Sequence, residues 1–139
     1  CALPIYCTTV VAVRQCMGVR FGHVDVPLLV FDGNCGFCRR SVRVMTERIR
    51  RHPVAVPWQS LDLHAYGLTE EQCSTAVQYV DKKSRTHSGA DAVAHLMIDA
   101  GFPWSVPGHL MRIPGIIHLC RAAYKWVANN RSRFRGDPA

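Results

Sequence analysis

The sequence predicts an α/β domain in which a central mixed sheet of about four strands is flanked by helices. Its 139 residues suit one domain, and a hydrophobic fraction of 48% with 19% charged residues is not the composition of a disordered chain. Short apolar runs alternate with longer segments of helical periodicity, which is the order of a sheet covered by helices. The first such run leads through a turn into a segment that carries a Cys-x-x-Cys pair.

Two parts of the chain are distinguished by composition. Residues 1–25 are predicted to be an N-terminal extension, either an edge strand built on TTVVAV or a disordered leader. They hold no Lys/Arg-rich start followed by an apolar core, so no signal peptide is predicted. Residues 26–139 are predicted to form the domain, with a basic C-terminal tail from about residue 129 that we expect to fray.

The first strand and helix surround the cysteine pair. Val26–Phe31 is a continuous apolar run that suits a buried strand, and Asp32-Gly33 ends it with turn chemistry. Asn34 is then a candidate N-cap of a helix over residues 35–51, which stops before Pro53.

Helical spacing divides that helix into two faces. An apolar stripe at i, i+4, i+7 and i+11 should face the core, and a polar stripe at i, i+4 and i+8 should face outward. The apolar stripe is Cys38, Val42, Met45 and Ile49, and the polar stripe is Cys35, Arg39 and Arg43. Cys38 is therefore expected to face inward, and Cys35 outward with Arg39 one turn away.

The rest of the chain supplies further strands and helices. In chain order these are a strand at Val54–Trp58, a helix starting at Thr69, a hairpin of Ala76–Asp81 and Thr86–Ser88, a helix at Gly89–Ala100, an irregular segment at Phe102–Ile113 and a helix at about Pro114–Asn129. Pro57 places its strand at an edge of the sheet. Thr69 with Gln72, and Ser88 with Asp91, have the spacing of capping boxes. The inward residues of the last helix are predicted to be Ile116, Cys120, Ala123 and Val127.

This order, a βαβ unit followed by a hairpin and helices, is thioredoxin-like, and a Cys-x-x-Cys pair beside a βαβ pattern indicates redox chemistry. Unpaired amides at a helix N-terminus stabilise an anion, so a thiolate there has a lowered pKa. We predict that Cys35 attacks, that Cys38 resolves the mixed disulfide, and that Arg39 helps to hold the thiolate. Asp32 either closes an Asx-turn or shuttles a proton to and from Cys38.

Three other interpretations of these features stay open. A zinc-binding module needs two more ligands, and no second Cys-x-x-Cys exists. Cys35 and Cys38 could also be small packing residues without a chemical role, as we expect for Cys73 and Cys120. The net charge of +7 would also suit a basic interaction domain that binds nucleic acid or anionic lipid, although no nucleic-acid motif accompanies it. The strand-turn-helix context favours the redox interpretation.

The stretch from Asp32 to Cys38 resembles the DCC family of predicted thiol-disulfide oxidoreductases, named for Asp-x-x-Cys-x-x-Cys. The resemblance continues through Arg39-Arg40, Val80-Asp81, Gly89 to Ala92, Pro114-Gly115, Tyr124 and Asn129 to Arg133, and so covers about residues 27–135. It implies a thioredoxin-like fold and protein-disulfide reductase activity. The cysteine pair would carry the electrons, with no cofactor and no metal.

One departure concerns substrate binding. Thioredoxins place a cis-proline opposite the cysteine pair, just before the hairpin strand, whereas Cys73-Ser74-Thr75 precede Ala76 here. The backbone that clamps substrates is therefore expected to differ, and Cys73 is a candidate third redox partner. We expect a thiol or disulfide substrate, either a protein or a small thiol, an electron donor that the sequence does not identify, a monomer, and a cytoplasmic location with peripheral membrane association as the alternative.

Overall fold

The computed structural model describes residues 26–134. Its strands are β1 (Leu28–Phe31), β2 (Val54–Pro57), β3 (Gln78–Val80) and β4 (Thr86–Ser88). Its α-helices are α2 (Gly36–Arg48), α3 (Glu70–Thr75), α4 (Gly89–Ala100), α5 (Ser105–Met111) and α6 (Ile116–Asn129). Three 3-10 helices are η1 (Trp58–Ser60), η2 (Leu63–Tyr66) and η3 (Arg131–Arg133). The predicted extension over residues 1–25, with its edge strand or leader, lies outside the described residues.

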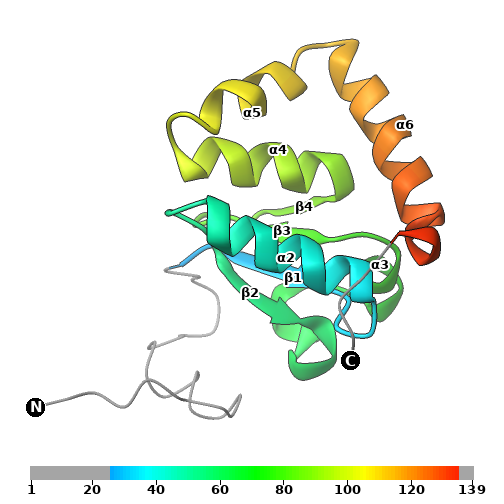
Figure 1. Cartoon of the computed structure of the whole chain (residues 1–139). Helices are drawn as coiled ribbons and strands as arrows, with labels where there is room; N and C mark the ends of the chain where they lie inside the picture. Colours follow the sequence, from blue (N-terminus) through cyan, green and yellow to red (C-terminus); the bar gives the residue numbers. More distant parts are fainter. Residues whose placement is uncertain (1–25, 135–139) are drawn as a thin grey trace, which may run out of the picture.

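The four strands form one mixed sheet in the order β2-β1-β3-β4 (Figure 1). β1 runs parallel to β2 and antiparallel to β3, with Leu29 opposite Ala55 on one side and Tyr79 on the other. β3 and β4 form the predicted hairpin. The prediction of a mixed four-strand α/β fold is confirmed and is consistent with a thioredoxin-like fold. β2 is an edge strand, as Pro57 predicted.

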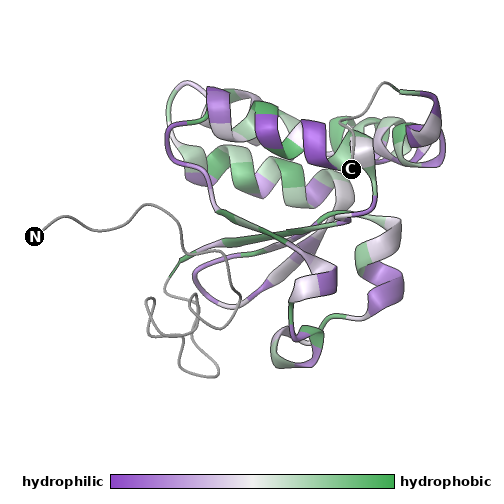
Figure 2. Ribbon diagram, turned by 60° about the horizontal axis from the view of Figure 1, so that its bottom comes forward, coloured by the Kyte–Doolittle hydropathy of each residue, from purple (hydrophilic) through white to green (hydrophobic). Residues whose placement is uncertain are grey.

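Two hydrophobic clusters cover the two faces of the sheet, because alternate residues of a strand point to opposite sides. The first cluster joins β1 and β3 to α3 and the 3-10 helices through Leu28, Val30, Leu63, Leu68, Cys73 and Val80. The second joins them to α2 and α4 through Leu29, Ile49, Tyr79, Ala92, Leu96 and Ala100. Figure 2 shows the sheet between the helices of its two sides. The predicted inward stripe of α2 is confirmed, since Val42 and Met45 also pack in the second cluster.

The prediction that Phe102–Ile113 is irregular is wrong, because α5 lies within it. Pro107 is the third residue of α5, where the backbone N–H has no partner inside the helix, so a proline costs no hydrogen bond there. Gly108 lets α5 lie directly on α4. A Cβ at Gly108 would be only 2.9 Å from the Ala94 carbonyl oxygen.

The C-terminal helix α6 packs against α4 along a face that differs from the predicted one by one residue (Figure 1). Ile116, Cys120 and Val127 are half-buried as expected, but Ala123 is exposed and Tyr124 takes the inward place. The Tyr124 hydroxyl accepts a hydrogen bond from the Val77 N–H at 3.0 Å, and its ring lies over Gly89. These two contacts explain the difference.

The two predicted capping boxes have opposite outcomes. Thr69 and Gln72 cap α3 reciprocally, as predicted. Ser88 makes no side-chain cap on α4, because its hydroxyl accepts a hydrogen bond from the buried Gln78 amide at 3.0 Å. Asp91 instead pairs with Arg121 of α6 at 2.9 Å. The second capping box is therefore wrong, and its two side chains tie α4 to neighbouring elements.

Candidate active site

The turn between β1 and α2 is held by Asp32. Its Oδ1 accepts the Asn34 N–H at 3.0 Å, and its carbonyl accepts the Cys35 N–H at 3.3 Å. This Asx-turn places Asn34 outside the helix and makes Cys35 the N-cap of α2. The prediction that Asn34 is the N-cap is therefore wrong by one residue, while the prediction of an Asx-turn at Asp32 is confirmed.

Cys35 receives the direct benefit of the helix start. Its Sγ accepts a hydrogen bond from the Cys38 N–H at 3.2 Å. Sulfur accepts such a bond best as a thiolate, and the positive end of the helix dipole favours the same charge. The first turn of α2 holds no acidic residue that would compete for this position. The predicted location of the Cys-x-x-Cys pair at a helix start is confirmed.

Cys38 has a different environment from Cys35. Both cysteines are half-buried, but Cys38 lies on the inward stripe of α2. Burial raises the pKa of its thiol to about 12, with further contributions from the hydrogen bond and the charge of Cys35. The Arg131 guanidinium acts in the opposite direction and lowers the pKa of Cys38. While Cys35 is free, Cys38 therefore stays protonated at neutral pH.

Gln59 fixes the geometry of the turn and was missed by the sequence analysis. Its amide oxygen accepts the Gly33 N–H at 3.1 Å, and its amide nitrogen donates to Asp32 Oδ1 at 2.9 Å. Gly33 is also sterically required, because a Cβ there would be 2.8 Å from the Cβ of Pro57. The contact of Gln59 with the turn could have been inferred from the parallel pairing of β1 and β2, because this pairing brings the ends of both strands to one edge of the sheet.

The two remaining predicted site residues lie in this turn. Arg39 donates from Nη1 to the Gly33 carbonyl, so it braces the turn one helical turn after Cys35. Its role in holding the thiolate stays a prediction. The Asp32 carboxylate raises the pKa of Cys38 slightly through its negative charge, behind burial, Cys35 and Arg131 in effect. Its role as a proton shuttle also stays a prediction.

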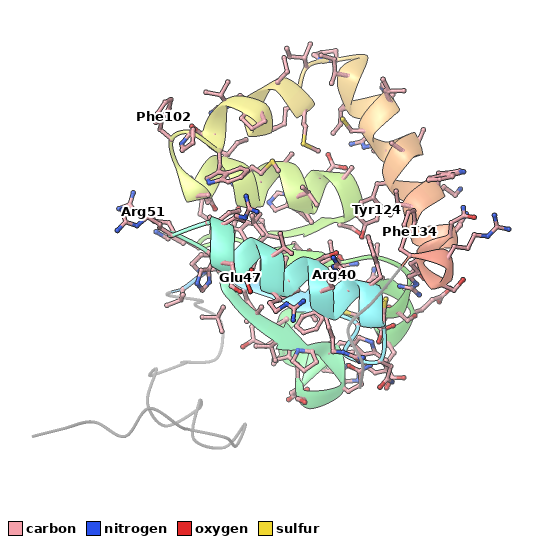
Figure 3. All side chains as sticks on the ribbon, viewed as in Figure 1. Arg40, Glu47, Arg51, Phe102, Tyr124 and Phe134 are labelled. Atoms are coloured by element: carbon pink, nitrogen blue, oxygen red, sulfur yellow. The ribbon has the colours of Figure 1, made fainter. Side chains whose placement is uncertain are left out.

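The segment after α6 docks beside the cysteines, and the prediction that the tail frays is wrong for residues 130–134. Arg131 donates to the Ser74 carbonyl at 2.8 Å. The Phe134 ring lies 5.2 Å from the ring of Phe37, which stands between the two cysteines in sequence. Figure 1 shows η3 next to the start of α2, and Figure 3 shows Tyr124 and Phe134 on that side of the molecule. The sequence signal for this docking was an aromatic residue, Phe134, within an otherwise basic segment.

The other cysteines of the described residues are free thiols. Cys73 is only 1% exposed in the core, and burial raises its pKa, which disfavours the thiolate that a redox partner needs. Cys120 is half-buried. Between residues 26 and 134, no three His, Cys, Asp or Glu side chains come together in a way that could hold a metal ion. No helix in that range has the length and apolarity to cross a membrane.

Comparison with known proteins agrees with this geometry. No curated protein and no solved structure matches the chain. The family model of the DCC1-like thiol-disulfide oxidoreductases matches residues 29–137, which include β1 from its second residue, the cysteine turn and the docked η3 segment. A match of this extent establishes the family. The chain therefore belongs to the DCC1-like thiol-disulfide oxidoreductase family.

Proposed function

We propose that this protein catalyses thiol–disulfide exchange, with Cys35 as the attacking and Cys38 as the resolving thiol. The observation that carries the proposal is the hydrogen bond from the Cys38 N–H to Cys35 Sγ at the start of α2. It gives the two thiols opposite properties, because Cys35 has a donor for its negative charge and Cys38 has a pKa raised to about 12. Such an asymmetry is what ordered attack and resolution require.

The reaction proceeds in two balanced steps. The Cys35 thiolate attacks one sulfur of the substrate disulfide, forms a mixed disulfide and releases the other sulfur as a thiolate. Cys38 then loses its proton and attacks Cys35 Sγ, which forms the Cys35–Cys38 disulfide and releases the second substrate thiolate. Two electrons pass from the cysteine pair to the substrate, and an external thiol donor must return them.

The mixed disulfide activates Cys38. The negative charge of Cys35, which raises the pKa of Cys38, disappears when Cys35 forms the mixed disulfide. The lowering effect of Arg131 remains. The pKa of Cys38 therefore falls at the moment when its thiolate is needed. We propose that Asp32 accepts its proton and that Arg39 supports the turn around Cys35.

The cofactor requirement, the substrate and the location that we propose follow from the exchange chemistry and from the family. The pair is its own two-electron carrier, so the proposed exchange uses neither an organic cofactor nor a metal. Reduction of protein disulfides is the activity that the family resemblance implies, and a small disulfide is the other substrate that the same steps would serve. The free thiols among the described cysteines suit a reducing compartment, so we propose a cytoplasmic location.

A redox titration tests the proposal. The reduced protein is equilibrated with mixtures of reduced and oxidised dithiothreitol, and the Cys35–Cys38 disulfide is followed by mass spectrometry after alkylation. We expect a single two-electron transition that Cys35→Ala removes. In Cys38→Ala, a stable mixed disulfide on Cys35 should accumulate with an aromatic disulfide reagent. If the wild-type protein never forms the Cys35–Cys38 disulfide under oxidising conditions, the proposed function is wrong.

A further inference from the structure

The two residues just before β3 use all of their backbone polar groups internally. The Ala76 N–H and carbonyl, and the Val77 N–H and carbonyl, each have a partner within the chain at 2.9 to 3.1 Å. In that order the partners are the Gln72 carbonyl, the Gln78 side-chain amide, the Tyr124 hydroxyl and the Gly89 N–H. The backbone here therefore has no unpaired N–H and no unpaired carbonyl for another chain to pair with.

This closed backbone adjoins the cysteine pair. Tyr124, whose hydroxyl accepts the Val77 N–H, lies on the same side of the molecule as Phe134, and the Phe134 ring lies 5.2 Å from the ring of Phe37 between the cysteines (Figure 3). Arg131, which acts on Cys38, is anchored on Ser74 two residues before Ala76. In thioredoxins this is the place of the backbone that clamps substrates. An extended peptide binds a backbone edge by pairing with unpaired N–H and carbonyl groups.

Tyr124 is the side chain that blocks pairing with the backbone at Val77. Its hydroxyl occupies the Val77 N–H, and its ring covers Gly89, where an added Cβ would lie 3.2 Å from the ring. An extended substrate segment would have to displace this side chain and leave a phenol without its partner in a largely buried place. A small disulfide needs no backbone pairing and only has to reach Cys35 Sγ.

Arg131 gives the same place a positive charge. Its guanidinium donates to the neutral Ser74 carbonyl at 2.8 Å, and a neutral acceptor does not cancel the charge. Arg131 is part of η3, whose neighbour Phe134 lies against Phe37 between the cysteines. An incoming disulfide that bears carboxylates would therefore be attracted to Cys35, and one that bears ammonium groups would be repelled.

We propose that the substrates are low-molecular-weight disulfides that carry carboxylates, and not extended segments of folded proteins. This inference rests on the proposed function, because it assumes that Cys35 attacks a disulfide. It deepens that function by naming the substrate class. Tyr124 would exclude extended segments, and Arg131 would be a specificity-determining residue.

The first experiment compares three aliphatic disulfides of different charge. Reduced wild-type protein is mixed with dithiodipropionate, bis(2-hydroxyethyl) disulfide and cystamine, which are anionic, neutral and cationic, and exchange is followed by stopped flow. The same series is run with Arg131→Gln, and with Arg51→Gln as a control. Arg51 is exposed on the side of the molecule away from Phe134, and its loss changes the net charge equally (Figure 3).

The three disulfides release different thiols and so react at different intrinsic rates. Because these differences are the same for every variant, they cancel when the variants are compared. Loss of the charge of Arg131 also alters Cys38, but it does so for every disulfide, so only the anionic-to-cationic ratio reports attraction. We expect Arg131→Gln to lower that ratio by about threefold to fivefold, the size of an exposed ion pair, and Arg51→Gln to leave it unchanged. Added salt should lower the wild-type ratio. An equal ratio in wild type and Arg131→Gln would overturn the charge selectivity.

The second experiment measures reduction of insulin disulfides with dithiothreitol as the electron donor. We expect the wild-type protein to add little to the rate with dithiothreitol alone, while it turns over dithiodipropionate. Insulin reduction as fast as that of the small disulfide would overturn the substrate class and leave exchange itself intact. Failure to react with any of the four disulfides, in protein with both thiols free, would instead overturn the proposed function.

Discussion

Two helices of this fold are the next element after a strand of the same sheet, and their starts differ in which side chains occupy them. At the start of α2, Cys35 Sγ accepts the Cys38 N–H, and the first turn holds no acidic residue. At the start of α4, Ser88 gives no side-chain cap, and Asp91 stands in the first turn with Arg121 bound to it. Tyr124 covers Gly89, the first residue of α4.

The difference shows which anion each helix dipole stabilises. A helix N-terminus favours negative charge within its first turn. At α4 the carboxylate of Asp91 supplies that charge permanently, and Arg121 lowers its pKa. At α2 the first turn holds no acidic residue, and Cys35 as a thiolate would supply the charge. The start of α4 is thus occupied by a permanent carboxylate, whereas the start of α2 is occupied by a side chain that is anionic only as a thiolate.

The largest expected effect comes from removing the accepting side chain at each start. Cys35→Ala should reduce disulfide exchange to the uncatalysed rate and cost about 1 kcal/mol of stability as a lost N-cap. Ser88→Ala should leave exchange unchanged, because Ser88 is exposed and serves the Gln78 amide. Stopped-flow exchange and urea unfolding measure both variants. Residual exchange in Cys35→Ala at the wild-type rate would contradict the comparison.

The next largest effect concerns Asp32, which holds the turn before α2. In Asp32→Asn the side-chain oxygen can still accept from Asn34 and Gln59, so thermal unfolding should change little. Loss of the carboxylate as proton acceptor should slow exchange by about 10²-fold, the lower range for general acid–base catalysis. Exchange at the wild-type rate would remove Asp32 from the proposed catalytic residues and leave it only its role in the turn.

Glycine substitutions test how tightly the start of α4 is filled. Gly67 and Gly89 have similar positive φ values of 64° and 58°, but only Gly89 has a ring against it. Gly67→Ala should lower the free energy of unfolding by about 1–2 kcal/mol through backbone strain. Gly89→Ala should cost about 1–3 kcal/mol more, because it also overpacks against Tyr124. If both variants lost the same free energy of unfolding in urea, the Tyr124 ring would move aside without cost.

Alkali should weaken the start of α2. The pKa of Cys38 is raised from 9.0 to about 12 in the folded state, so folding favours the protonated thiol. This contribution is fully present below pH 9.0 and is lost as the pH rises from there toward 12. Reduced wild-type protein should therefore lose more stability over this range than Cys38→Ala. If the urea midpoints of wild type and Cys38→Ala fell equally over this pH range, the raised pKa of Cys38 would be contradicted.

Acid should weaken the start of α4, by the smallest of these effects. Arg121 holds the pKa of Asp91 below its ordinary value of 3.8, so this contribution is present above pH 3.8 and disappears as the pH falls further. The stability difference between wild type and Arg121→Gln should be small at pH 7 and should shrink at pH 3. Urea midpoints at the two pH values measure it. A difference that persists in acid would mean that Arg121 stabilises α4 by packing.

Local chemistry made the first half of the fold predictable. The apolar run that becomes β1, the turn at Asp32-Gly33 and the stripe of α2 each follow from neighbouring residues, and the structure contains them. The capping box at Thr69 is equally local. The same logic failed at Ser88, because the buried amide of Gln78 on the adjacent strand competes for its hydroxyl. A long-range partner decided that position.

The part of the site that sequence reasoning missed comes from long-range contacts. Gln59 reaches Asp32 across 27 positions, and Arg131 reaches Ser74 across 57. No periodicity links such residues, so their charge and polarity looked like ordinary surface. α5 was hidden for a different reason, because Pro107 resembles a helix breaker until its place in the first turn is known. The cysteines themselves were predictable because strand, turn and helix follow each other directly.

The docking of η3 ties the integrity of the chain to its chemistry. A protease that cut after Asn130 would detach Arg131 and Phe134 from the cysteine pair and leave the sheet, α2 to α6 and both cysteines in place. Circular dichroism and thermal unfolding would register little, since residues 131–134 lie outside both hydrophobic clusters. The proposed charge selectivity at Cys35 would change all the same. Preparations of this protein should therefore be checked for an intact C-terminal segment by mass, not by fold.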